Sequence, residues 1–196
     1  YDLIELDLGL SPGVTLRQLR SARLAASGVA ISPGPLFEVG LGGERVGSDR
    51  LEVGPAAVEA EGAARRLAVP IDGTGAGVPL RGRLLVTVGH EDGIRMELDL
   101  RNASEQVLRP HLRFPILRDV RLGSVEATWY LYAQRGGIIS AAPVRRREPV
   151  GGAYPLQVMS VFSPQGGALG LFTEDRDDIY RFWELCKHAD GVDLSL

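Results

Sequence analysis

The sequence predicts an all-β protein, built as a large antiparallel β-sandwich. Short apolar or alternating runs recur along all 196 residues, and turn residues separate them, which is the pattern of many short strands. The 25 glycines and 12 prolines are spread through the chain and supply those turns. About a dozen or more strands fit within a single domain over residues 1–196, and we expect little helix.

The first quarter of the chain predicts an opening strand, a hairpin and a further strand. Residues 2–8 alternate between apolar and polar and form the opening strand. Residues 14–19 and 22–26 form the hairpin. Residues 36–39 form the next strand, and the glycine pair at 42–43 allows the chain to reverse after it.

Residues 55–67 are ambiguous between helix and strand. Their alanine and glutamate content, with Pro55 at the first turn, suits a helix. Gly62 lies at the centre, however, and alternation follows at 67–71, so we favour two strands around Gly62. The glycine-rich run at 73–77 leads into a strand rather than a helix. It offers no helix N-terminus for a phosphate and predicts a flexible loop.

The clearest local signal is a hairpin over residues 80–102. Even-numbered positions 84–88 of its first strand and 94–100 of its second strand are apolar, while charged residues alternate with the latter. Asp92-Gly93 lies between the two runs, and this pair accepts the positive φ angles of a type I′ turn. One face of the hairpin is therefore predicted to be core.

The following stretch predicts two strands and a loop. Residues 107–117 form a long strand, in which Pro110 and Pro115 remove ladder donors and imply bulges or an edge position. Residues 129–133 form an aromatic strand, and residues 141–152 form a loop.

Residues 154–186 predict three antiparallel strands joined by tight connections. The first two carry apolar residues at both parities, with Val158 and Phe162 on one face and Met159 and Val161 on the other. Both faces are therefore predicted to be covered. Residues 191–196 form a last strand, which we expect to continue into the rest of a longer protein.

This C-terminal pattern resembles the N-terminal β-domain of a group of bacterial glycoside hydrolases. In that family a galactose-mutarotase-like supersandwich precedes a (β/α)8 catalytic barrel of the α-galactosidase-like type. The motifs that carry the resemblance are Tyr154-Pro155, Gln157-x-Met159, Gly166-Gly167, Gly170 to Thr173 and an acidic turn at Asp175, with upstream pieces at 35–39, 102–117 and 128–131.

The resemblance implies an accessory domain that catalyses no reaction itself and lies at the N-terminal side of a longer protein. It places the two catalytic carboxylates on the barrel, so no catalytic residue is expected here. The implied partners are that downstream barrel and, in the parent protein, a carbohydrate. An autonomous carbohydrate-binding or aldose-epimerase-like domain is the alternative, and a purely structural sandwich is a third possibility.

Composition bounds the other classes of function. A net charge of −3 creates no general attraction for nucleic acid or an anionic membrane, and no apolar run of 18 residues is present. The lone Cys186 permits no disulfide within the chain and excludes a cysteine-based metal cluster, which leaves the compartment open. No cofactor is implied.

Candidate contact residues are arginine and aromatic side chains in predicted loops and at strand ends. In the resembling hydrolases, loops at one end of the sandwich face the barrel, and arginine and aromatic side chains suit such interfaces. Trp183 shares a face with Arg181, which predicts that it lies at an interface. The carbohydrate or interdomain contacts are accordingly predicted at Arg145, Arg146, Arg147, Tyr154 and Trp183, with partial exposure of residues 145–154.

Neither metal nor epimerase chemistry is expected. The acidic run offers oxygen ligands for Ca²⁺ but lacks the glycine and terminal glutamate of a calcium loop, so a solvated turn is the better reading. None of the three histidines lies in a mutarotase motif, so they are interpreted as surface histidines. These residues are Glu174, Asp175, Asp177 and Asp178 for the acidic run, and His90, His111 and His188.

Overall fold

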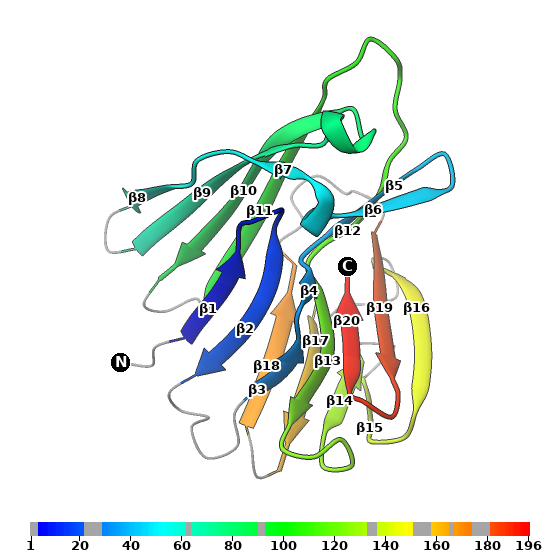
Figure 1. Ribbon diagram of the computed structural model, residues 1–196. Helices are drawn as coiled ribbons and strands as arrows, with labels where there is room; N and C mark the ends of the chain where they lie inside the picture. Colours follow the sequence, from blue (N-terminus) through cyan, green and yellow to red (C-terminus); the bar gives the residue numbers. More distant parts are fainter. Residues whose placement is uncertain are drawn as a thin grey trace. The chain divides into compact units, whose positions relative to one another are not determined.

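The computed structural model describes residues 4–21, 29–61, 64–89, 93–132, 137–150, 158–164, 167–173 and 181–196 (Figure 1). Within these ranges the chain is built from antiparallel strands, and its helical elements are two three-residue 3-10 turns, η2 (Ser48–Arg50) and η3 (Thr74–Ala76). The predicted all-β sandwich class is confirmed. No helix in the described part of the chain is long and apolar enough to cross a membrane.

The chain divides into two compact units. The first contains residues 7–17 and 34–115, and the second contains residues 2–6, 18–33 and 116–196. A small sheet with the order β1-β2-β4 has residues in both, because β1 (Ile4–Gly9) and β2 (Thr15–Ser21) each straddle a boundary, while β4 is Gly34–Pro35.

The first unit is organised around the predicted hairpin. β10 (Leu80–Val88) pairs with β11 (Ile94–Asn102), and the register sets Leu84 opposite Leu98 and Val86 opposite Met96. Apolar residues thus meet on one face, as the alternation predicts. The sheet continues through β9 (Ala64–Asp72), on which β7 (Glu52–Val53) and β8 (Ala57–Glu61) both pair. Two strands therefore flank Gly62, as favoured from the sequence.

A second sheet of the first unit has the order β12-β5-β6. Its strands are β5 (Glu38–Leu41), β6 (Glu44–Gly47) and β12 (His111–Arg113). Gly42 and Gly43 have φ angles of 60° and 94° and make the predicted reversal between β5 and β6. The buried hydroxyl of Ser48 accepts from the backbone N–H of Leu36 at 2.9 Å and donates to the carbonyl of Val14 at 2.6 Å, which ties three segments together.

The second unit contains two layered sheets. A five-stranded sheet has the order β16-β19-β20-β13-β3, and a four-stranded sheet has the order β15-β14-β17-β18. Tyr132 on β14 donates its hydroxyl to the carbonyl of Trp183 on β19 at 3.0 Å, so the inner faces of the two sheets meet. The strands of the first sheet are β3 (Val29–Ser32), β13 (Ile116–Leu122), β16 (Val144–Val150), β19 (Arg181–Lys187) and β20 (Val192–Ser195), and those of the second are β14 (Trp129–Tyr132), β15 (Ile138–Ser140), β17 (Val158–Ser163) and β18 (Gly167–Phe172).

Three predictions about strands are corrected. The long strand over 107–117 is wrong: residues 107–110 are not in a strand, and β12 ends before Pro115, which has no N–H to continue the ladder. The loop over 141–152 is wrong for residues 144–150, which form β16. The three C-terminal strands do not share one sheet, because β19 pairs with β16 and β20 while β17 pairs with β18.

The predicted flexible loop at 73–77 holds an ordered turn. The carboxylate of Asp72 accepts from the backbone N–H of Thr74 at 2.9 Å and from its hydroxyl at 2.5 Å. These hydrogen bonds, with an ion pair to Arg81 at 2.7 Å, hold the pKa of Asp72 below its ordinary value. The carboxylate of Asp72 thus caps the turn, which backbone hydrogen bonds from Gly73 to Leu80 and from Val78 to Gly73 also hold.

Candidate functional site

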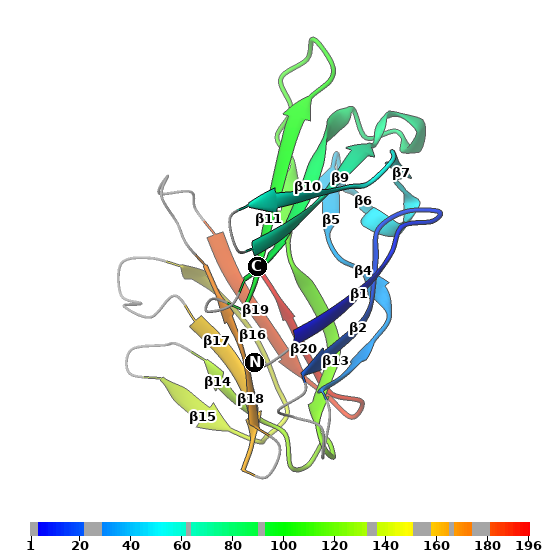
Figure 2. The same ribbon diagram turned by 90° about the vertical axis from the view of Figure 1, so that its left-hand side faces the viewer.

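The four-stranded sheet of the second unit (Figure 2) has one buried face and one face whose described side chains are half-buried or exposed. Tyr130, Tyr132, Met159 and Val161 point to the other side and are buried in the core. The open side, which we call the aromatic face, consists of Trp129, Leu131, Ile139, Val158, Ser160, Phe162, Ala168, Gly170 and Phe172, which the strand register places in adjacent rows.

Trp129 and Phe162 form the centre of the aromatic face. They are direct partners across β14 and β17, and their rings stack with centroids 6.5 Å apart and planes 26° apart. Trp129 keeps 37% of its surface exposed, whereas Phe162 is half-buried. Phe162 thus supports the indole and holds it in one orientation on the sheet.

Phe172 extends the aromatic face on the last strand of the sheet. A Cβ atom on Gly170 would lie only 2.9 Å from the ring of Phe172, so the ring occupies the space above this glycine. Phe172 is 73% exposed, and Val158 is its partner on β17. Because Gly170 has no side chain, the ring lies against the sheet rather than standing away from it.

The aromatic face is an apolar surface with little polar character. Its nine members include three aromatic rings and one hydroxyl, that of Ser160, and none of them carries a charge. A ring on an open apolar surface stacks on the apolar side of a pyranose, and few polar groups are needed to orient it. None of the nine side chains titrates in the physiological range, so the face supplies no acid–base pair.

The predicted contact residues Arg145, Arg146 and Arg147 lie on β16 at the edge of the other sheet. Arg145 and Arg147 are exposed, as predicted, and Arg146 is half-buried. Arg147 pairs with Glu184 at 2.8 Å, and its guanidinium lies 4.0 Å from the ring centre of Phe182. Both partners of Arg147 are on β19, so this arginine is held along its own sheet.

The two predicted aromatic contacts have different outcomes. Trp183 is only 3% exposed and faces the core of the second unit, so its expected position at an interface is wrong. Alternation along β19 explains the burial, because Trp183 shares its side with Leu185 and Lys187, which are also buried. Tyr154 lies outside the described residues, and so does the acidic run at 174–178.

A cluster that the sequence does not reveal surrounds His188 in the turn between β19 and β20. Its Nε2 lies 3.4 Å from Asp119 Oδ1 and 3.3 Å from Asp193 Oδ1. A bulge in β13 brings Asp119 there, since the pairing of β13 shifts register on both sides of this residue, whose φ is 50°. Because Asp119 and His188 are far apart in the sequence, no local motif marks the cluster.

The two ring nitrogens of His188 have different partners. Nδ1 accepts from the backbone N–H of Asp190 at 3.3 Å, and Nε2 faces the two carboxylates. The cluster is therefore a clasp of close polar contacts between β13 and the β19–β20 turn. It gives His188 the satisfied surroundings expected from the sequence.

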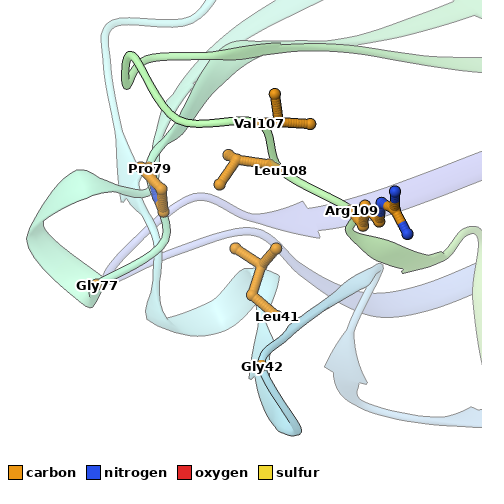
Figure 3. A pocket seen from close by; sticks show the side chains of 7 residues that line it. All are labelled: Leu41, Gly42, Gly77, Pro79, Val107, Leu108 and Arg109. Atoms are coloured by element: carbon orange, nitrogen blue, oxygen red, sulfur yellow. The ribbon is translucent and has the colours of Figure 1, made fainter.

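A shallow hollow of about 600 Å³ lies on the first unit (Figure 3). Leu41 and Leu108 point toward each other across it, and Arg109 lies at one side. The hollow is lined mainly by backbone and aliphatic groups, with Arg109 as the single charged residue, so it gathers no set of polar groups around a ligand. His111, on the neighbouring strand β12, is exposed, while His90 lies outside the described residues.

The sequence contains a signal for the aromatic face that alternation alone misreads. Residues 129–132 and 158–162 are apolar or aromatic at both parities, which predicts cover on both sides of the sheet. In the structure one parity is core and the other is half-buried or open. Strands with two apolar faces thus occur either in an inner sheet or in a sheet with one partly exposed apolar face.

Comparison with known proteins adds no relative. No protein-family model, no curated protein and no solved structure matches this chain.

Proposed function

We propose that this chain is a non-catalytic β-sandwich domain that binds carbohydrate through its aromatic face. In this proposal it is an accessory domain of a glycoside hydrolase. The observation that carries the proposal is the stacked and partly exposed Trp129, set among uncharged neighbours. The hydrolase context rests on the resemblance of the C-terminal motifs. Absence of an acid–base pair on the aromatic face supports a role in binding rather than turnover.

The chemistry of the face favours neutral sugars. Without a charged side chain among its nine members, it gives no ion pair to a uronic acid or a sulfated glycan. Stacking and burial of apolar C–H groups would supply most of the affinity, and the hydroxyl of Ser160 is a single polar contact. The proposed ligand class is therefore a neutral polysaccharide with apolar pyranose faces.

A catalytic barrel is the second partner in this proposal. Arg145 and Arg147 are exposed on β16, the edge strand of the five-stranded sheet. Arginine at an exposed edge suits a polar interdomain contact, which is the kind that accessory domains make. This contact would use the other sheet of the second unit and would leave the aromatic face free for glycan.

Affinity electrophoresis in gels that contain neutral polysaccharides tests the proposal. We expect at least one neutral glucan, galactan or mannan to retard the chain, and Trp129→Ala to weaken that binding at least about tenfold. Val107→Ala is the matched control, since Val107 is 91% exposed on the first unit and should leave retardation unchanged. Equal retardation of the Trp129→Ala variant and the unsubstituted chain would overturn the assignment of the face.

A further inference from the structure

β18 is an edge strand without the usual protection of an edge. It pairs with β17 on one side, and no described strand pairs with its other side. Its six residues read Gly-Ala-Leu-Gly-Leu-Phe, with no charge and no proline. A strand of this kind presents an unpaired row of backbone N–H and C=O groups, which is a template for another strand.

Other edges in the described part of the chain are protected by charge or by shortness. β11, β8, β16, β6 and β1 all carry charged residues, and β12 carries His111 and Arg113. The edge β7 carries Glu52, and the uncharged edges β3, β4 and β15 have only four, two and three residues. Both devices suppress pairing between chains. β18 therefore differs from every one of these edges.

The residues of β18 are complementary to those of a second, antiparallel β18. With a two-fold axis at Gly170, Ala168 of one copy lies opposite Phe172 of the other, and Leu169 lies opposite Leu171. Each large ring thus meets a small residue on the aromatic face, and leucine meets leucine on the inner face. Leu169 and Leu171 are half-buried, whereas Met159 and Val161 on the neighbouring strand are fully buried, so these leucines have surface left to cover.

We propose that two copies of this chain associate by antiparallel pairing of β18 about Gly170. Each pair joins two even-numbered or two odd-numbered residues, so the same face of both copies lies on the same side of the joined sheet. The two-fold axis is therefore perpendicular to the sheet. The two four-stranded sheets then form one continuous sheet of twice as many strands, and the two aromatic faces become a single surface. An uncharged strand pairs with its own copy without like-charge repulsion. This inference stands on the edge and does not depend on glycan binding.

Sedimentation equilibrium over a range of concentrations tests the association. We expect the unsubstituted chain to form a reversible dimer. In the double variant Ala168→Lys with Phe172→Lys, a lysine of one copy lies opposite a lysine of the other at both 168–172 pairs. The dissociation constant of its dimer should therefore rise at least about tenfold. The variant Ala168→Lys with Phe172→Glu places lysine opposite glutamate in the same register and should bring the dissociation constant back toward that of the unsubstituted chain.

The matched control is Ile139→Lys, which adds a lysine to the same face at the opposite edge of the sheet and should leave the dimer unchanged. Circular dichroism and thermal melting of every variant ensure that the comparison is between folded chains. A chain that is monomeric at all concentrations overturns the proposal. An unchanged dimer in the lysine–lysine variant also overturns it, and so does a lysine–glutamate variant as dissociated as the lysine–lysine one.

Discussion

Lys187 is a charged residue that lies inside the second unit. It is buried, and its ammonium donates to the backbone carbonyl of Val125 at 2.9 Å and to that of Thr128. Thr128 itself donates to the carbonyl of Ser124 at 2.8 Å. Lys187 therefore fixes the loop that leads into β14, the strand that carries Trp129. Burial lowers the pKa of Lys187, and the carboxylate of Glu126 partly opposes this shift.

Replacing Lys187 with methionine tests this role. Two carbonyls lose their donor, so we expect the free energy of unfolding to fall by about 1–3 kcal/mol. The folded pKa of Lys187 lies below its ordinary value of 10.5, so folding releases protons between the two pKa values. The stability of the unsubstituted chain should then rise with pH in that window relative to the Lys187→Met variant. Urea unfolding of both proteins at pH 7 and pH 10 measures both effects. If the unsubstituted chain and the Lys187→Met variant are equally stable at both pH values, Lys187 does not stabilise this loop.

At the scale of elements, what the sequence predicts depends on how local the cause is. The hairpin of β10 and β11 is predicted because alternation and the turn residues are both local, and Gly93 indeed has a positive φ of 72°. β16 is missed because Arg145, Arg146 and Arg147 look like a solvated loop. They are strand residues because β19 supplies a partner, and Glu184 there neutralises Arg147.

The candidate site shows the same limit. The aromatic residues are visible in the sequence, but which of them is exposed depends on which sheet each strand joins. Trp183 is buried since β19 belongs to the five-stranded sheet and this side chain lies on the same side of the strand as the buried Leu185 and Lys187. Trp129 lies on the other side of β14 from the buried Tyr130 and Tyr132 and keeps 37% of its surface exposed. The bulge at Asp119 likewise results from pairing with strands distant in sequence.

Gly82 provides a test of the hairpin as an element. A Cβ atom at this position would collide with the carbonyl oxygen of Asp99 on the paired strand β11. Gly82→Ala should therefore lower the free energy of unfolding by about 1–3 kcal/mol, as overpacking does. Gly89→Ala is the matched control, since its nearest contact would be an ordinary 3.8 Å to Ala64. Chemical denaturation measures the free energy of unfolding of both variants, and equal losses would contradict the close approach of Asp99 to Gly82.

At the scale of the whole molecule, each of the following features belongs to one of the two compact units. The first unit holds the hairpin sheet and the shallow hollow, and the second holds the aromatic face, β16 and the clasp at His188. The binding proposal therefore belongs to the second unit. Within it, the two tryptophans of the chain have opposite surroundings, one partly exposed on the aromatic face and one in the core.

This contrast gives the most direct measurement of the central claim, that the aromatic face binds carbohydrate. Trp183→Phe leaves Trp129 as the only tryptophan, and Trp129→Phe leaves Trp183. On addition of a polysaccharide that retards the chain, the emission of Trp129 should shift to the blue and become protected from acrylamide quenching, because a stacked sugar removes water from the indole. The emission of Trp183 should not change. A Trp129 signal that stays fully quenchable while the polysaccharide is bound would contradict the claim.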